Sequence, residues 1–294
     1  MVTCTDQRIP CFDLCQLTVT GPICPTCLLS VSPFAEVSIL SDEDGHPELD
    51  TTPSSVEQEA AVDLTDIYKS LKDSLGNKDL KVGHINVNGI INKLNEVHVL
   101  LNEVKWHILG ITETHLTAST PDNLLRLPGF DFVRKDRSSC KGGGVLIYYQ
   151  ESLTVHQDLK WDIKDLEAVW INVTMRSQSA LIGCLYRPPK DMAFFSSLQG
   201  LLNKIWVKRK NVVLIGDVNS NLLPAPNQDQ DLSLCGTKPQ RILNIFGYLN
   251  VIKSPTRITK NSTTLLDLVI TSPNLNCLKS GSIDLGISDH HLVY

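Results

Sequence analysis

Apolar positions between residues 81 and 294 recur in two different rhythms. Short apolar runs bounded by turn residues predict strands at 82–87, 108–112, 144–149, 168–174, 180–186, 212–215 and 264–270, with a last strand beginning at His291. Three- and four-residue spacing predicts helices at 92–105, 195–206 and 240–249. This order favours an α/β (α+β) fold, a four-layer sandwich of two packed mixed β-sheets flanked by helices.

The first 80 residues differ from the rest in composition. They carry 14 acidic and 4 basic residues, a net charge of -10, whereas 81–294 carry 18 acidic and 23 basic residues, a net charge of +5. Apart from a short helix expected at 63–75, this part reads as an acidic, largely disordered leader. We therefore expect a leader over 1–80 and one domain over 81–294, whose final strand looks truncated because the chain stops at Tyr294.

Five of the nine cysteines fall within the first 27 residues. The pairs Cys11 with Cys15 and Cys24 with Cys27 have spacings that allow a zinc site. No histidine lies nearby, which favours free thiols in a reducing compartment instead. Both interpretations remain open.

Targeting signals are not evident in the sequence. No apolar run approaches the roughly 20 residues of a membrane helix, and the start lacks the pattern of a secretion signal. We expect an intracellular protein without a membrane partner. The mild positive charge of 81–294 is compatible with a phosphate-bearing partner.

Polar side chains that bind metals or move protons recur where the predicted strands end. They are Asn86, Asn88, Glu113, Tyr186, Asp217, Asn219, Asp267, Asp289 and His290. Taken singly, each has a simpler explanation, such as a turn at Asn88 or a helix cap at Glu113. Strand ends that share one rim are where a rigid scaffold presents catalytic groups, so the ordered set predicts one catalytic cleft.

Six segments carry a resemblance to a known family. They are His84–Gly89, Ile111–Thr114, Tyr186–Pro189, Gly216–Asn219, Leu265–Leu268 and Ser288–His291. In order and spacing they resemble the successive motifs of the endonuclease/exonuclease/phosphatase superfamily. Within 81–294, three stretches most resemble the apurinic-type endonuclease domain of LINE-type (non-LTR) retrotransposons: Gly142–Tyr148, Tyr186–Pro189, and Ser254–Arg257 ahead of Asp267.

The resemblance implies a metal-dependent DNA endonuclease. In such elements it nicks target DNA and leaves a 3′ hydroxyl that primes reverse transcription, and a reverse transcriptase domain follows, which this chain lacks. The expected partner is DNA, and the expected location is nuclear. Alternatives are an abasic-site repair endonuclease, another phosphoesterase of the same fold, or a catalytically inactive element-derived fragment.

The resemblance also implies a role for each matching residue. Glu113 would bind Mg²⁺, or alternatively Mn²⁺, with Asn86 as a neutral ligand or phosphate contact. Asp289 would reach the metal or a second water. Asp217 would orient or deprotonate the attacking water, and Asp267 would hold His290 against the scissile phosphate. Asn219 and Tyr186 would contact the phosphoryl group. The expected substrate contacts are Asn88, Arg187, Arg257 and Ser288, with Arg137 and Lys141 as further phosphate contacts.

Two positions depart from the family pattern or leave a choice. Val218 replaces the Phe of Gly-Asp-Phe-Asn, an apolar exchange that should leave Asp217 and Asn219 in place. His291 follows His290 directly, and the residue next to Asp289 is expected to be the catalytic histidine.

Overall fold

The computed structural model describes residues 64–76, 79–138, 142–176, 178–223 and 238–294. These residues belong to one compact unit, Glu59–Tyr294. The cysteine pairs of the leader and Lys141 lie outside the described residues.

One six-stranded sheet has the order β13-β14-β1-β2-β4-β3. Its strands are β1 (Val82–Asn86), β2 (Ile108–Thr112), β3 (Phe130–Lys135), β4 (Val145–Gln150), β13 (Ser282–Ile283) and β14 (Leu292–Val293). β1 and β2 run parallel, while their other neighbours are antiparallel. The first sheet is therefore mixed.

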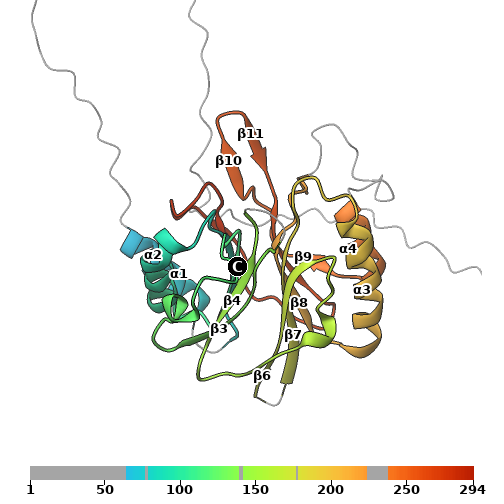
Figure 1. The fold of residues 1–294 in the computed structure, drawn as a ribbon, viewed down its shortest axis with the longest axis horizontal. Coiled ribbons are helices and arrows are strands. Elements are labelled where there is room, and N and C mark those ends of the chain that lie inside the picture. Colours follow the sequence, from blue (N-terminus) through green and yellow to red (C-terminus); the bar gives the residue numbers. More distant parts are fainter. Residues whose placement is uncertain (1–63, 77–78, 139–141, 177, 224–237) are drawn as a thin grey trace, which may run out of the picture. The chain divides into compact units, whose positions relative to one another are not determined.

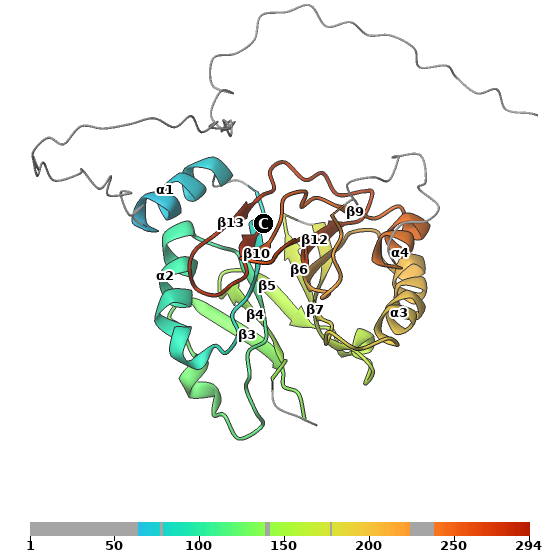
Figure 2. The same cartoon turned by 90° about the horizontal axis from the view of Figure 1, so that it is seen from above.

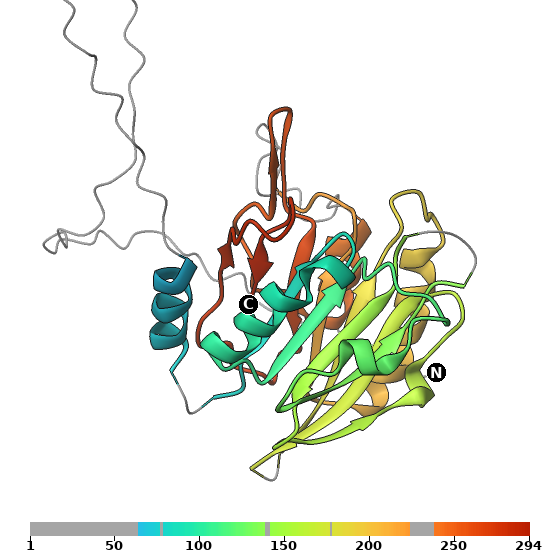
Figure 3. The ribbon, with the colours of Figure 1, turned by 60° about the vertical axis from the view of Figure 1, so that its left-hand side comes forward.

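A second six-stranded sheet has the order β5-β6-β7-β8-β12-β9. Its strands are β5 (Thr154–Gln157), β6 (Glu167–Met175), β7 (Gln178–Tyr186), β8 (Val212–Asp217), β9 (Leu249–Asn250) and β12 (Asp267–Thr271). Here β7 and β8 form the parallel pair, so this sheet is mixed as well. A hairpin of β10 (Arg257–Thr259) and β11 (Ser262–Thr264) extends beyond both sheets (Figures 1 and 3).

Helices cover the outer faces of the two sheets (Figure 2). α1 (Leu64–Leu75) and α2 (Leu94–Val104) lie on the first sheet, and α3 (Phe194–Lys208) and α4 (Lys238–Phe246) lie on the second. Short 3-10 helices occur at η1 (Ile91–Lys93), η2 (Asp122–Leu125) and η3 (Leu159–Trp161). The predicted four-layer sandwich is confirmed. Within the described residues, no helix combines the length and apolar character needed to span a membrane.

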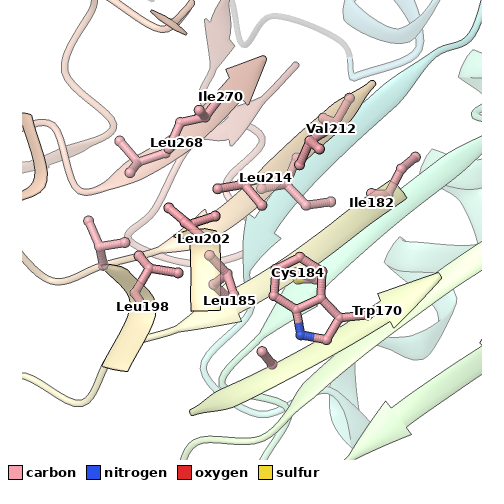
Figure 4. Packing of buried hydrophobic residues seen from close by; sticks show 14 of the residues in the cluster. Trp170, Ile182, Cys184, Leu185, Leu198, Leu202, Val212, Leu214, Leu268 and Ile270 are labelled. Carbon is pink, nitrogen blue, oxygen red and sulfur yellow. The ribbon is translucent and has the colours of Figure 1, made fainter. Parts of the chain in front are cut away.

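The two sheets pack directly against each other. Ile108 and Ile147 of the first sheet belong to the same buried cluster as residues of strands β6 to β8 and helices α3 and α4. Figure 4 shows part of this cluster, including Trp170, Leu202 and Leu214. The approach is closest at Gly110, where an added Cβ would lie 2.5 Å from Cδ1 of Ile215 and 2.8 Å from Sγ of Cys184. The absence of a side chain at this position lets the strands that carry the polar rim come together.

The folded part begins before the predicted boundary at residue 81. Tyr68 and Leu71 of α1 are 4% and 2% exposed, in the cluster that includes Val97 and Leu101 of α2. The sequence did not indicate this packing, because α1 presents a narrow apolar stripe among charged residues and the partners of that stripe lie in other elements.

Edge elements were the ones the sequence pattern missed. β3 and β5 lie at the outer edges of their sheets, and most of their residues are only partly buried or exposed, so their apolar rhythm is weak. The helix predicted at 240–249 ends earlier, at Phe246. Gly247 adopts a φ of +64°, the N–H of Tyr248 donates to Leu243, and Leu249–Asn250 pairs with β12.

The last strand was expected to look truncated. In the structure, Leu292–Val293 pairs with β13 on one side and, at Val293, with His84 of β1 on the other. Both residues of β14 are fully buried, so the segment after His290 is fixed within the sheet.

We predict that Gly110→Val lowers the free energy of unfolding by about 2–3 kcal/mol, because its side chain overfills the space between the sheets. Gly200→Ala is the matched control, because Gly200 lies within α3 and no atom lies near the position of an added Cβ. This substitution should raise the free energy of unfolding by about 0.5–1 kcal/mol. Urea titrations of both variants provide the measurement. Equal midpoints for Gly110→Val and wild type would contradict the close sheet approach.

Candidate active site

The register of the strands gathers the predicted polar residues on one rim. Tyr186 lies opposite Asp217 in the parallel pair of β7 and β8. Asp217 in turn lies opposite Asp267, where β8 ends and β12 begins. In the first sheet Asn86 lies opposite Thr112, directly before Glu113. The sequence prediction of a shared rim thus corresponds to adjacent register positions.

The side-chain amide of Asn86 connects the two sheets. Its Nδ2 lies 2.9 Å from Oε1 of Glu113 and 2.9 Å from Oδ2 of Asp217. Its Oδ1 accepts a hydrogen bond from the backbone N–H of Asn88 at 3.1 Å. Since the donor end faces the carboxylates, Asn86 here holds two carboxylates together. This geometry differs from the expected role as a metal ligand, which needs the oxygen.

Glu113 occupies a backbone conformation that is uncommon for a side-chain-bearing residue. Its φ is +52°, and His115 follows with +55°. Two backbone hydrogen bonds hold this conformation: the N–H of Gly89 donates to the carbonyl of Glu113, and the N–H of His115 donates to the carbonyl of Gly143. Such local strain is retained where a surrounding structure specifies it, and here it directs the carboxylate to Asn86 and Tyr186.

Tyr186 donates from its hydroxyl to Oε1 of Glu113 at 3.0 Å. Burial and the nearby Glu113 charge raise the pKa of this phenol, which therefore stays protonated and remains a donor. The guanidinium of Arg137 lies 5.5 Å from the ring centre and is paired with Glu167 at 2.5 Å. Arg137 thus supports the ring of Tyr186.

Asp217 and Asn219 form a tight turn after β8. Gly216 is required there, since a Cβ would lie 1.9 Å from the carbonyl oxygen of Leu185. The N–H of Asn219 donates to Oδ1 of Asp217 at 2.8 Å, and its Nδ2 donates to the carbonyl of Arg187 at 2.9 Å. Asp217 is fully buried. Burial and the charge of Asp267 raise the pKa of Asp217 to about 7.

The side chain of Arg187 points into the protein, and its expected contact with substrate stays a prediction. Its side chain is 7% exposed and stacks over the ring of Phe195 at 4.9 Å. The guanidinium donates to the carbonyls of Asp191, Val218 and Asn219. These bonds turn it inward, where it braces the turn that presents Asp217.

His290 is anchored by Asp267. Its Nδ1 lies 2.8 Å from Oδ2 of Asp267, which leaves Nε2 for other partners. Burial would lower the pKa of His290, but the hydrogen bond and charge of Asp267, with the charges of Asp217 and Asp289, outweigh it and raise that pKa. One ligand-type atom from each of Asp217, Asp267 and His290 lies within 4.8 Å of the others.

Ser288 and Asp289 connect this loop to its surroundings. The hydroxyl of Ser288 donates to the carbonyl of Asn86 at 2.5 Å and accepts from the N–H of His290 at 3.1 Å. Asp289 is paired with Arg257 at 2.8 Å. Burial alone would raise the pKa of Asp289, but the Arg257 hydrogen bond and the charges of His290 and Arg257 outweigh burial and lower that pKa. In this arrangement the carboxylate of Asp289 is paired with Arg257, whereas the sequence analysis expected it to reach a metal.

Residues 83–290 match the Endonuclease/Exonuclease/phosphatase family, over most of the chain. The chain belongs to this family. No curated protein matches it.

Solved structures share the fold of this family member. The endonuclease domain of TRAS1, a telomere-specific non-LTR retrotransposon, has 15% identity and a TM-score of 0.53, covering 73% of this chain and 96% of that one. An AP endonuclease from Archaeoglobus fulgidus has 18% identity and a TM-score of 0.53, covering 73% and 98%. AP endonuclease LMAP from Leishmania major has 13% identity and a TM-score of 0.62, covering 75% and 89%.

The donor set of this endonuclease/exonuclease/phosphatase family member fits a hard divalent cation. Glu113 is a carboxylate with 23% of its side chain exposed, and one amide joins it to the buried carboxylate of Asp217. Oxygen ligands of this kind suit Mg²⁺ and Mn²⁺. The carboxylates of Glu113, Asp217 and Asp267 also concentrate negative charge that a cation would neutralise.

His84 is the residue of the site that the sequence did not single out. It is fully buried, with Nε2 3.0 Å from Oγ1 of Thr112 and Nδ1 3.6 Å from Oδ1 of Asp267. Burial lowers the pKa of His84 to about 4, more than the charge of Asp267 raises it, so the ring is neutral. The available signal was its place two residues before Asn86, on the same face of β1.

We predict that the difference in Tm between Asp217→Asn and wild type shifts in favour of the variant from pH 5 to pH 8. The folded pKa of about 7 lies above the ordinary 3.8, so the folded state binds the proton more tightly than the unfolded state. The contribution of Asp217 to stability therefore falls as pH rises between these values. We expect a change of at least about 2–4 °C, which corresponds to about 1 kcal/mol.

The control for this titration is Asp165→Asn, at an exposed carboxylate in the same protein. Its Tm difference from wild type should stay constant over the same pH range. A constant difference for Asp217→Asn as well would show that Asp217 titrates normally.

Proposed function

We propose that this chain is a divalent-metal-dependent DNA endonuclease of a non-LTR retrotransposon, which nicks target DNA to prime reverse transcription. The observation that carries the proposal is the amide of Asn86, which joins the Glu113 and Asp217 carboxylates beside the Asp267 and His290 pair. A metal-type carboxylate, a carboxylate with a pKa near neutrality and an oriented imidazole at one rim are the groups that phosphodiester hydrolysis needs.

The residues divide the reaction between them. Asp217 takes a proton from the attacking water, for which a pKa of about 7 is well suited. His290, with Nδ1 held by Asp267, presents Nε2–H to a phosphoryl oxygen. Attack of the water breaks the bond between phosphorus and O3′, and O3′ takes a proton from solvent water, which leaves a 3′ hydroxyl and a 5′ phosphate. Glu113 would hold Mg²⁺ or Mn²⁺, which would neutralise negative charge on the phosphate.

Support for the retrotransposon class comes from two directions. The motifs at Tyr186–Pro189 and Ser254–Arg257 resemble such endonuclease domains, and the TRAS1 domain has the same fold. The hairpin β10–β11 presents Ile258 and Lys260 to solvent. A β-bridge between Arg257 and His290 connects this hairpin to the loop that holds His290. A two-stranded ribbon of this kind suits contact with a DNA groove.

A reverse transcriptase domain and a nuclear location follow from this proposal. The nick acquires its use when a polymerase extends the 3′ hydroxyl, so the partner is a reverse transcriptase from the parent element. The substrate is chromosomal DNA, which places the activity in the nucleus.

Abasic-site cleavage is the second candidate, because AP endonucleases share the fold with comparable TM-scores. An inactive, element-derived fragment is less well supported. The hydrogen bonds among Asn86, Glu113, Asp217 and Tyr186 form a connected polar network, which is the arrangement expected of a maintained site.

We predict that the full chain converts supercoiled plasmid to the open circle with Mg²⁺ or Mn²⁺ and not in EDTA. Asp217→Ala and His290→Ala should each lose at least about 10²-fold in rate, because each removes a proton-transfer or charge-stabilising group. Agarose gels of timed reactions measure the conversion.

His291→Ala is the matched control for His290→Ala, since the two histidines are neighbours and only His290 pairs with Asp267 in the structure. It should retain nicking within about threefold. Folded wild type that leaves plasmid, with either metal, untouched would sink the DNA endonuclease proposal.

A duplex containing one abasic analogue, compared with the same intact duplex, separates the two candidates. For a target-nicking endonuclease we predict cleavage of both duplexes within about tenfold, since binding rests on the DNA backbone and its shape. Preference for the abasic duplex by a factor of about 10³ or more would instead assign the chain to abasic-site cleavage.

A further inference from the structure

Asp267 lies between two imidazole rings. Its Oδ2 is 2.8 Å from Nδ1 of His290, and its Oδ1 is 3.6 Å from Nδ1 of His84. Asp267 and His84 are both fully buried. Each carboxylate oxygen of Asp267 thus faces a ring nitrogen of a different histidine.

The inner pair contains two buried atoms without another partner. Nδ1 of His84 and Oδ1 of Asp267 form no hydrogen bond in the structure. Buried polar atoms are nearly always hydrogen-bonded, because an unpaired one keeps its desolvation cost. Since the two atoms face each other and are complementary in type, a slight rotation of either side chain brings them to hydrogen-bonding distance.

The carboxylate of Asp267 can only accept, which requires the proton of a neutral His84 ring on Nδ1, and Thr112 is a compatible partner for Nε2. Its hydroxyl lies 3.0 Å from Nε2 of His84, and Thr112 is itself fully buried. A hydroxyl that donates to Nε2 leaves the single proton of a neutral imidazole on Nδ1. That proton then points at Asp267.

We infer that His84 is a positioning residue of the active site: its Nδ1–H holds Oδ1 of Asp267, so that Oδ2 fixes the ring of His290. The inference rests on the proposed hydrolysis at this site. It adds a buried relay of contacts from Thr112 through His84 and Asp267 to His290, in which His84 touches neither substrate nor metal. His84 acts by orienting the carboxylate of Asp267, because a carboxylate held at one oxygen alone is free to turn.

Two amide replacements separate the donor function from simple filling of space. In His84→Asn the side-chain nitrogen occupies the position of Nδ1 and retains a donor for Asp267. In His84→Gln the amide reaches the position of Nε2, near Thr112, and leaves Oδ1 of Asp267 without a donor. The first should keep kcat for plasmid nicking within about threefold, and the second should lose about 10- to 100-fold in kcat with KM unchanged.

Nuclear magnetic resonance of the full chain labelled with ¹⁵N-histidine supplies a readout that needs no activity. The ¹⁵N shifts of wild-type His84 should show a neutral ring protonated at Nδ1. The Nδ1–H resonance of His290 should persist in His84→Asn and shift or broaden in His84→Gln. Thr112→Val, which removes the hydroxyl while preserving shape, should leave the proton of His84 on Nδ1, because Oδ1 of Asp267 can only accept.

Protonation of His84 at Nε2 in wild type would overturn the inference without any variant. Equal losses in His84→Asn and His84→Gln, with the His290 resonance unmoved, would also overturn it, because that result marks a packing role. If the resonances behave as expected while wild type fails to nick DNA, the proposed endonuclease function fails and the positioning of His290 by His84 stands.

Discussion

The amide of Asn86 donates from the first sheet to Asp217 in the second, and the rest of the active rim depends on that contact. It forms where β2 and β8 approach closely enough that Gly110 has no room for a side chain. The same amide holds Glu113, which in turn accepts from Tyr186. Packing between the sheets therefore determines the distance between the carboxylates of Glu113 and Asp217, and a change in this packing alters that distance.

The site contains buried charges and strained backbone that destabilise the folded state, and the surrounding fold must offset this destabilisation. Asp217 and Asp267 are fully buried and close together, which raises the pKa of Asp217. Glu113 and Asn219 occupy left-handed backbone conformations. Proteins keep such features where chemistry needs them, because a more stable arrangement would lose the pre-organised charges. The inward-facing guanidinium of Arg187 shows one means of support, since it donates to the carbonyls of Val218 and Asn219 in the turn.

Family membership accounts for the scaffold, and the side chains at the rim account for what it can do. The same sandwich is found in the retrotransposon endonuclease domain and in the AP endonucleases, at 13–18% identity. A fold shared at that level does not specify a substrate. The β10–β11 hairpin, which adjoins His290 through the bridge at Arg257, projects beyond the two sheets here (Figure 1).

The sequence by itself determined the central strands and the residues at their ends, because a buried strand is a continuous apolar run and its first polar residue marks the rim. It could not show α1 packing on α2 or the edge strands β3 and β5, whose partly polar patterns have meaning only beside a neighbour. Nor could it show that Arg187 turns inward or that His84 backs Asp267. A side chain's partner comes from another strand, and only the tertiary structure decides which atoms it meets.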